Sequence, residues 1–370
     1  MAGSAYCWGL NSHNQVVDGR RTQYKDVMSD LKKILPQRVK GVKEVFDISC
    51  GGYFTLLQTV DGRVFSFGKG QYGRLGRGSE EDQSEPGVVK IDDRAKEISA
   101  GAWHGAIVTD KGELYIWGHG KVMGQKHHLV VPRLIESLAR VVIESVSCGN
   151  NSTLALDHEG SVYSWGSGAH GVLGHGDVKS RKEPEKIKGL EGKEISYINA
   201  GHVHCGAVTK DKKLFMWGLA EGWGRKGTAI ELQPTELFVK DDAGDEKEVE
   251  MVSCSVGEHH PHTLILTEGG VVYSCGDGYK GKLGVGDQEW RNQPCRVSGL
   301  EGAVKVAAGG IHSAALDKEG KVYTWGCGSD GRLGHPDAEG HRWNYDYDSE
   351  IWSNNNLFAG IYLEKMFLKL

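Results

Sequence analysis

The sequence predicts an all-β protein, a seven-bladed β-propeller of about 50-residue repeats. The first observation behind this prediction is a strand-like segment of the VYSWG type, which occurs seven times at spacings of 48 to 59 residues. The glycines that end these segments are Gly9, Gly68, Gly118, Gly166, Gly218, Gly276 and Gly326. The second observation is composition, because 54 glycines beside 8 prolines indicate many tight turns between short strands.

The third observation is a motif of the form AGxxHxxAL, which recurs in phase with the first. Its six copies begin at Ile48, Ile98, Val146, Ile198, Val252 and Val306. A tight turn and the strand ending in glycine follow each copy, and Pro-containing segments such as 86–91, 131–135 and 183–187 leave room for a further edge strand. A unit of about four strands cannot bury its own faces, so the units are expected to stack around an axis as blades. An open β-solenoid is the structural alternative.

Repeats of the form VYxWGxGxxGxLGxGD that alternate with AGxxHxxAL resemble those of the regulator of chromosome condensation family. The resemblance covers Ala5 to Asp337, about nine-tenths of the chain. It implies a seven-bladed propeller. It does not imply one function, because propellers of that family serve several unrelated roles.

The repeats end before the chain does. We expect residues 1–337 to form the propeller and residues 338–370 to form an atypical C-terminal tail. A closed ring needs seven AGxxH units and the sequence has six, so the tail is either a variant end that leaves the last blade incomplete or a source of substitute strands or a cap through IYLEKMFLKL. Insertions at 19–41, with an amphipathic stretch DVMSDLKKIL, and at 239–250, which is acidic, map to loops of the repeats.

The segment Val162–Asp177, VYSWGSGAHGVLGHGD, contains the G-x-G-x-x-G pattern of dinucleotide-binding loops. The longer form G-x-G-x-x-G-x-L-G occurs four times, starting at Gly68, Gly166, Gly276 and Gly326, whereas a cofactor site is normally made once and opens a helix. We therefore interpret these glycines as architectural and expect no bound cofactor.

Bulk properties narrow the function class. The formal net charge is −5 and there is no basic tail, so we expect no direct nucleic-acid binding. The sequence shows neither a long apolar run nor a secretory signal, which predicts no membrane span and a cytoplasmic or nuclear protein that is not secreted. The 8 cysteines include no C-x-x-C pair and are expected to be buried thiols.

Histidines are the main candidates for chemistry. His104, His204 and His312 share one phase of the repeat, where we expect partly buried imidazoles hydrogen-bonded to backbone; a metal site around the axis is the alternative. A denser cluster is His259, His260 and His262, for which we expect no metal because no acidic or thiol partner is suitably spaced. No catalytic constellation stands out, so we predict no enzymatic activity.

The founding member of the resembling family is a guanine-nucleotide exchange factor for the small GTPase Ran, which engages its partner through polar loop residues on one face. The matching loop positions of this sequence hold one acidic residue, Glu258, and one tryptophan, Trp103, which argues against Ran exchange and against the family's tryptophan-based light sensing. We therefore predict a non-enzymatic protein-interaction propeller, a scaffold or adaptor, with an exchange factor or other regulator of a small GTPase as the alternative. The predicted partner-binding residues are Trp103, Asn150, Asn151, His202, Glu258, His259, His260, Asp241 and Asp242.

Overall fold

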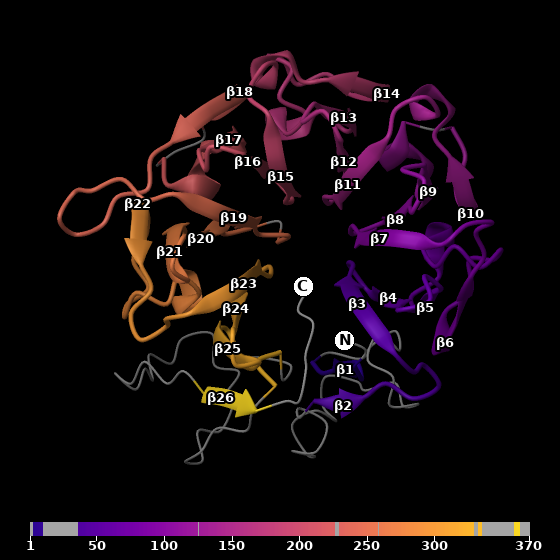
Figure 1. Ribbon diagram of the computed structural model, residues 1–370, viewed down its shortest axis with the longest axis horizontal. Helices are drawn as coiled ribbons and strands as arrows, with labels where there is room; N and C mark the ends of the chain where they lie inside the picture. Colours follow the sequence, from indigo (N-terminus) through magenta and orange to yellow (C-terminus); the bar gives the residue numbers. More distant parts are fainter. Residues whose placement is uncertain are drawn as a thin grey trace.

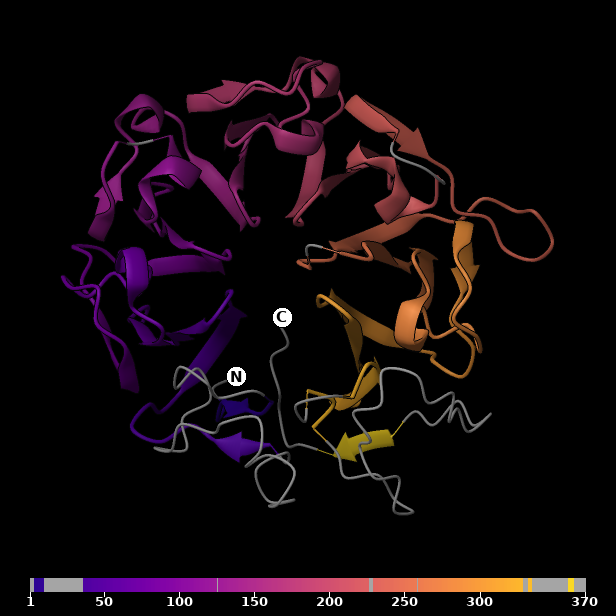
Figure 2. The same ribbon diagram turned by 180° about the vertical axis from the view of Figure 1, so that it is seen from behind.

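The computed structural model describes residues 3–9, 36–124, 126–225, 229–257, 259–328, 332–334 and 359–362. These residues form a ring of β-sheets around a central axis, which Figures 1 and 2 show from its two faces. The prediction of an all-β propeller is confirmed. Within these ranges, none of the helices has the length and apolar character needed to cross a membrane.

Six of the sheets are four-stranded blades, whose strands run antiparallel in chain order from the axis to the rim (Figure 1). The first three blades are β3 (Val45–Cys50), β4 (Phe54–Thr59), β5 (Val64–Gly68), β6 (Gln83–Val89); β7 (Ala95–Ala100), β8 (His104–Thr109), β9 (Leu114–Gly118), β10 (Leu129–Leu134); and β11 (Ile143–Cys148), β12 (Ser152–Asp157), β13 (Val162–Gly166), β14 (Arg181–Lys186). The next three are β15 (Ile195–Ala200), β16 (His204–Thr209), β17 (Leu214–Leu219), β18 (Ile230–Leu237); β19 (Val249–Cys254), β20 (His262–Thr267), β21 (Val271–Gly276), β22 (Arg291–Arg296); and β23 (Ala303–Ala308), β24 (His312–Asp317), β25 (Lys321–Gly326), β26 (Ala359–Tyr362). Short 3₁₀ helices are η2 (Gln71–Gly73), η3 (Gly120–Met123), η4 (Glu136–Leu138), η5 (Ala169–Gly171), η6 (Lys188–Leu190), η7 (Ala220–Trp223) and η8 (Tyr279–Gly281).

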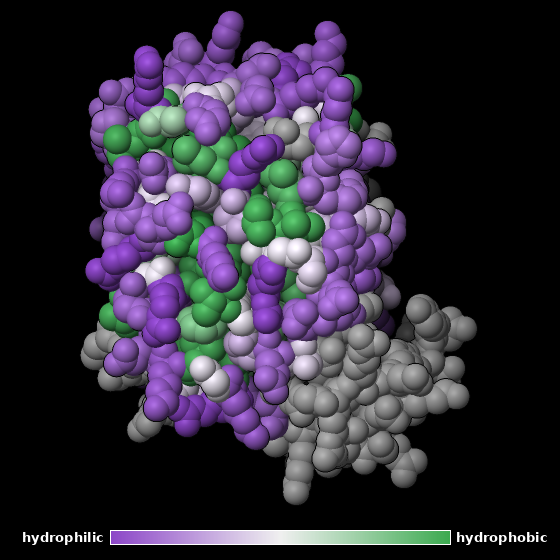
Figure 3. Space-filling model, turned by 90° about the vertical axis from the view of Figure 1, so that its right-hand side faces the viewer, coloured by the Kyte–Doolittle hydropathy of each residue, from purple (hydrophilic) through white to green (hydrophobic). Residues whose placement is uncertain are grey.

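The fourth strand of each blade lies at the rim of the ring. Five of these strands contain a proline, at Pro86, Pro132, Pro184, Pro234 and Pro294. Proline has no N–H to donate, so a sheet tolerates it at an edge. The expectation of a further edge strand in each repeat is therefore confirmed. Figure 3 views the rim from the side of β6 and β10, where apolar side chains lie among hydrophilic ones.

At four places in the described ring, a tryptophan at the end of a third strand joins its blade to the one before it. The indole Nε1 of Trp117 donates a hydrogen bond of 2.8 Å to the backbone oxygen of Arg74 in the preceding blade. The same bond joins Trp217 to Val172, Trp325 to Lys282 and Trp8 to Arg332. A Cβ on Gly76 would lie 2.8 Å from the Trp117 Nε1, so glycine is required where the indole packs. The hydrophobic core therefore lies between blades, as in the cluster that packs Leu56 against Trp117.

A second set of bonds joins the first strands around the axis. The Ser49 Oγ accepts a hydrogen bond of 2.9 Å from the Ala100 N–H of the next blade. At the same position of the following blades, a side-chain oxygen accepts from the backbone N–H of the next blade in the pairs Ser99 with Cys148, Ser147 with Ala200, Asn199 with Cys254 and Ser253 with Ala308. In the sixth blade this position is Ala307, which has no side-chain oxygen. The series therefore ends at the seam between the last blade and the first.

The predicted count of seven blades is wrong for the described residues, which form six four-stranded blades. A two-stranded sheet of β1 (Tyr6–Cys7) and β2 (Gln37–Arg38) stands in the seventh place. Because β1 runs into Trp8 and Gly9, this sheet corresponds to the third and fourth strands of a blade. The physical reason is the one visible in the sequence, where six AGxxH units can supply the first two strands of six blades.

A short segment of the C-terminal tail completes the sixth blade. β26 pairs antiparallel with β25, with Lys321 opposite Tyr362. The tail thus supplies a substitute strand, as one of the two alternatives expected. The rest of the tail and the helical stretch expected in the 19–41 insertion lie outside the described residues, and the domain boundary at 337 stays a prediction.

Candidate partner-binding face

Two kinds of loop meet at one end of every blade. Antiparallel strands reverse direction at each turn, so the loops that join first to second strands and third to fourth strands lie on the same side of the ring. We call this side the loop face. Its described loop residues are 51–53, 101–103, 149–151, 201–203, 255–257, 259–261, 309–311, 69–82, 119–124, 126–128, 167–180, 220–225, 229 and 277–290. The opposite end carries the remaining turns and the connections between blades.

The predicted partner-binding residues fall into two groups. The loop face carries Trp103, Asn150, Asn151, His202, His259 and His260. Asp241 and Asp242 lie at the opposite end, in the connection between β18 and β19, and Glu258 lies outside the described residues. On the loop face the structure brings together Asn150 and His202, since the Asn150 Nδ2 donates to the His202 Nε2 at 2.6 Å across 52 positions of chain.

The acidic connection forms a turn of its own, which projects from the rim (Figure 1). The Asp241 Oδ1 accepts hydrogen bonds from the backbone N–H groups of Ala243 and Asp245 at 3.0 and 2.9 Å. The Asp241 Oδ2 lies 2.5 Å from the Lys247 Nζ, and this hydrogen bond is the largest cause of a lowered pKa at Asp241. Part of the negative charge in this loop is therefore used to close the loop.

The glycine-rich loop at Val162–Asp177 is held inside its own blade. The Ser164 Oγ donates a hydrogen bond of 2.7 Å to the backbone oxygen of Leu173. The same bond occurs in the three other blades with the G-x-G-x-x-G-x-L-G sequence, from Ser66 to Leu75, Ser274 to Leu283 and Thr324 to Leu333. The loop passes into the three-residue η5 rather than into an α-helix that could face a pyrophosphate. This geometry supports the architectural interpretation of its glycines.

Buried histidines begin several second strands and join adjacent blades. The His104 Nε2 lies 2.9 Å from the Thr153 Oγ1 of the next blade, within hydrogen-bond distance. His204 with Thr263 and His262 with Ser313 repeat this pair at the same distance. Our expectation of partly buried imidazoles bonded to backbone is wrong for His104 and His204, because they are fully buried and their partners are side-chain hydroxyls. The third histidine of that expectation, His312, is partly buried. In the first blade the position is Phe54, and the next blade there has Gly105 instead of a hydroxyl.

Burial lowers the pKa of these imidazoles, because the charged form would lose its hydration. The pKa falls from 6.5 to about 3 for both His104 and His204. It falls to about 4 for His312, and well below the ordinary value for His262. These groups are therefore neutral near pH 7. Across the described ranges, His, Cys, Asp and Glu form no group of three or more that could hold a metal ion.

An aromatic and cationic cluster lies on the loop face between the first two blades. The Tyr72 ring centroid lies 5.8 Å from that of Trp103, 4.4 Å from His119 and 4.9 Å from His128. The Arg74 guanidinium carbon lies 4.8 Å from the Trp103 ring centroid and 5.8 Å from that of Tyr72. Side chains from two blades therefore gather around one guanidinium.

Arg74 itself is fully buried. Its Nε donates to the backbone oxygen of Gln71 at 2.9 Å and its Nη1 to that of Ala102 at 3.2 Å, while its Nη2 has no partner within the part of the chain that the structure describes. Desolvation lowers the pKa of Arg74 to about 10, so the guanidinium remains charged at pH 7. The cation–π contacts with Trp103 and Tyr72 compensate part of the lost hydration.

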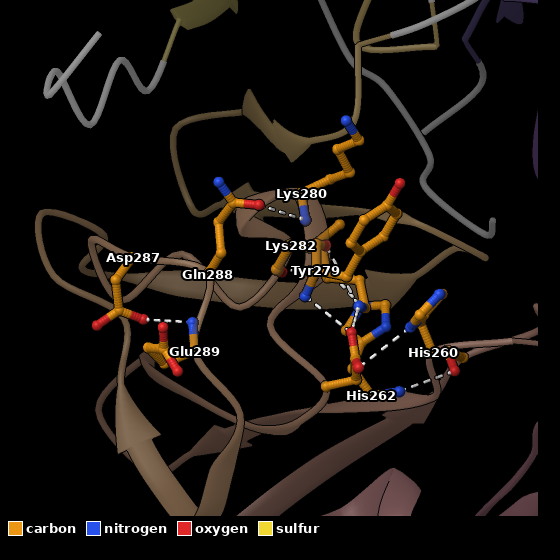
Figure 4. Close-up of polar contacts among 11 residues, drawn as sticks. His260, His262, Tyr279, Lys280, Lys282, Asp287, Gln288 and Glu289 are labelled. Atoms are coloured by element: carbon orange, nitrogen blue, oxygen red, sulfur yellow. Dashed lines mark hydrogen bonds and ion pairs between the residues drawn. The ribbon is translucent and has the colours of Figure 1, made fainter. Parts of the chain in front are cut away.

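In a related cluster of the fifth blade, a carboxylate of the same blade neutralises the buried cation (Figure 4). The buried Lys282 Nζ donates to the Asp277 Oδ1 at 2.5 Å and to the backbone oxygen of Tyr279 at 3.3 Å. The Asp277 Oδ2 lies 3.1 Å from the His260 Nδ1, and the His260 ring stacks on Tyr279 at 4.5 Å. Desolvation raises the pKa of Asp277, but the hydrogen bonds from Lys282 and the Tyr279 N–H outweigh it and leave that pKa lowered.

The residues at the centres of these two clusters were missed at the level of sequence. They lie in the third-to-fourth loops, whereas our candidates came from the first-to-second loops and from the connection between β18 and β19. The signal was present, since Arg74, Val172, Lys282 and Arg332 all directly precede the Leu-Gly of the repeat. The third blade folds with valine at this position, so the fold does not require a cation there. The Arg or Lys of the other repeats therefore indicates a role other than packing.

Comparison with known proteins identifies the family. A sequence model of the RCC1-like domain matches residues 4–346. The chain belongs to the RCC1-like domain family. It is 33% identical to the ultraviolet-B receptor UVR8 of Arabidopsis thaliana over 322 residues, which is 84% of this chain and 69% of UVR8. It is 34% identical to the E3 ubiquitin-protein ligase HERC2 of Homo sapiens over 284 residues, 74% of this chain but 6% of HERC2.

Solved structures agree on the fold. The RCC1-like chain superposes on Prp20p of Saccharomyces cerevisiae, a protein characterised for its binding to Gsp1p and histones, with a TM-score of 0.75 and 24% identity. The match covers 89% of this chain and 82% of that one. At this level of identity the likeness concerns the propeller and not its partners.

Proposed function

We propose that this RCC1-like propeller is a non-enzymatic protein-interaction module that binds its partner through the loop face. The observation that carries the proposal is the composite surface there, where side chains from different blades meet at fixed distances. Asn150 reaches His202, and Tyr72 meets Trp103, across blade boundaries held by buried bonds. A rigid scaffold that presents adaptable loops is suited to protein recognition.

A serine beside a histidine could suggest a catalytic pair, but the serine that lies there has a structural role. The Ser164 Oγ lies 2.9 Å from the His175 Nε2, but it is fully buried and its proton is donated to Leu173. Ser66 makes the equivalent bond to Leu75. Such a hydroxyl is not available as a nucleophile, because nothing exposes it to a substrate.

Regulation of a small GTPase is the second candidate, and the likeness to Prp20p, which was characterised with Gsp1p, supports it. The two candidates differ in one assay. An exchange factor accelerates the release of fluorescent mant-nucleotide from a panel of small GTPases, whereas a scaffold leaves that rate unchanged.

Chemical crosslinking of the tagged chain in cells, followed by mass spectrometry, tests the main proposal. We expect specific partners crosslinked to residues 101–103, 149–151 and 259–261. A matched pair of variants separates the two ends of the ring. Trp103→Ala is expected to remove some of these partners, and Asp241→Lys with Asp242→Lys tests whether the two predicted residues at the opposite end of the ring also bind. Absence of any specific partner would refute the proposed function. The compartment stays a prediction, cytoplasmic or nuclear, which imaging of the tagged chain checks.

A further inference from the structure

The two clusters of the loop face have matched frameworks and opposite charge balance. Arg74 in the first blade and Lys282 in the fifth occupy the same position of the repeat, and both side chains are fully buried. In the fifth blade the residue directly after the strand-ending glycine is Asp277, whose carboxylate pairs with Lys282 at 2.5 Å. In the first blade that residue is Lys69. The first cluster therefore holds a second cation where the fifth holds a counter-ion.

No carboxylate in the described ranges lies within ion-pair distance of Arg74 or Lys69. Two acidic groups of the same loop accept hydrogen bonds from its backbone, the Asp82 Oδ1 from the Gly70 N–H at 3.0 Å and the Glu80 Oε2 from the Tyr72 N–H at 3.3 Å. Asp82 also favours the charged form of Arg74 electrostatically. The positive charge of the cluster is only partly balanced by these groups.

The pKa of His119 indicates that the electrostatic potential at this cluster is positive. After desolvation, the causes that lower the pKa of His119 are electrostatic interactions with His128, Lys121 and Arg74. The cations also border exposed aromatic surface, because the Lys69 Nζ lies 5.2 Å from the Tyr53 ring centroid and Tyr53 is 40% exposed.

We propose that the cluster of Lys69, Tyr72, Arg74, Trp103 and His119 binds an acidic segment of a protein partner, whose Asp or Glu carboxylate supplies the negative charge that Asp277 supplies in the fifth blade. The inference rests on the proposed function and names the chemistry of its partner. Trp, Tyr and Arg are the side chains most enriched at the centres of protein interfaces. The rings of Tyr72 and Trp103 are held by the guanidinium beneath them, so less conformational entropy is lost on binding. The carboxylate approaches the exposed rim of the cluster and the buried charge of Arg74 acts through its low-dielectric surroundings.

The third blade provides the residues for a matched test. It has Ser167 and Val172 at the two positions, and Trp217 still donates to the Val172 backbone oxygen at 2.8 Å. The double variant Lys69→Ser with Arg74→Val therefore removes both cations by means of residues that the same loop already accommodates. The control, Asp277→Ser with Lys282→Val, introduces the same two residues at the equivalent positions of the fifth blade. It removes an ion pair whose net charge is zero.

Random peptides displayed on phage are selected against the full chain, and the enriched peptides are then measured by fluorescence polarisation. We expect enrichment of Asp and Glu beside an aromatic residue, a loss of affinity of roughly tenfold or more in the first-blade variant, and no change in the control. Circular dichroism and urea denaturation establish that both variants fold.

Each other result overturns the inference. Enriched peptides that are not acidic, or that bind both variants as they bind wild type, exclude a carboxylate site. A single-stranded oligonucleotide bound by wild type and lost in the first-blade variant would assign the cluster to phosphate. Sedimentation showing a dimer that the variant abolishes would assign it to a second copy of the chain. Crosslinked partners that persist in the first-blade variant would sink this inference while the proposed function stands, whereas no crosslinked partner at all would remove both.

Discussion

The indole Nε1 of Trp8 donates a hydrogen bond of 3.0 Å to the backbone oxygen of Arg332, 324 positions away in the chain. It is the same bond that Trp117 makes to Arg74 between the first two blades. A Cβ on Gly334 would lie 2.6 Å from the Trp8 Nε1, as one on Gly76 would crowd Trp117. The two-stranded sheet of β1 and β2 therefore docks on the sixth blade by the standard contact between blades, although it lacks the inner half of a blade.

Trp8 is expected to stabilise this closure. Trp8→Ala should lower the free energy of unfolding by about 2 to 3 kcal/mol through lost packing and the lost hydrogen bond. Trp8→Phe introduces the side chain that Phe67 supplies at the same position of the first blade. It should cost about 1 kcal/mol, because it removes the bond and keeps most of the packing. Urea denaturation measures both. No loss of stability in Trp8→Phe would show that the hydrogen bond contributes nothing, and equal losses in the two variants would show that the packing contributes nothing.

The histidine–hydroxyl pairs should be energetically coupled. His104→Phe leaves the Thr153 hydroxyl unpaired and Thr153→Ala leaves the imidazole unpaired, so each should cost about 1 to 3 kcal/mol. The double variant should cost less than the sum, with a coupling energy of about 1 kcal/mol. The measurement is a double-mutant cycle by urea denaturation. Additive losses would mean that the 2.9 Å contact does not stabilise the fold.

Stability should fall in acid partly because of these histidines. In the unfolded chain an imidazole takes up a proton near pH 6.5, whereas folded His104 does so near a pKa of about 3. Since the folded pKa is the lower one, stability is lost as the pH falls below 6.5, by about 1.4 kcal/mol per pH unit for each such group. His104→Phe should make the slope of unfolding free energy between about pH 6 and pH 4 shallower by that amount. An unchanged slope would contradict the neutral buried imidazole.

Gly76 should tolerate alanine less well than an open glycine does. Gly76 and Gly192 both have a left-handed φ, +68° and +74°, but a Cβ meets the Trp117 indole at Gly76 and meets nothing within 4 Å at Gly192. Gly192→Ala should therefore cost about 1 kcal/mol from backbone strain, and Gly76→Ala about 1 to 2 kcal/mol more from the clash. Thermal unfolding of the two variants compares them. Equal shifts would show that the indole moves aside without cost.

Much of the fold could be predicted because its signals are local and repeated. The strand that ends at Gly68, the AGxxH segment before it and the turn between them recur in register, so periodicity alone indicated blades and an edge strand at the rim. The incomplete seventh place was also visible, since six AGxxH units can build the inner strands of six blades.

The candidate site was predicted only in part, because it depends on which loops meet across blade boundaries. The sequence pointed to Trp103 but not to Tyr72, Arg74 or His119, which reach it from other loops of the ring. It also grouped Asp241 with His260, which the antiparallel turns place at opposite ends.

The sequence by itself determined that this chain is a propeller of glycine-ended strands whose glycine-rich loops are architectural. Only the tertiary structure decided what the buried polar groups do. It paired His104 with Thr153, and it left Arg74 under Trp103 where Lys282 has Asp277. The physical reason is that strand and turn preferences act between neighbours in the chain, while a hydrogen bond or an ion pair between blades exists only once the ring has brought distant positions together.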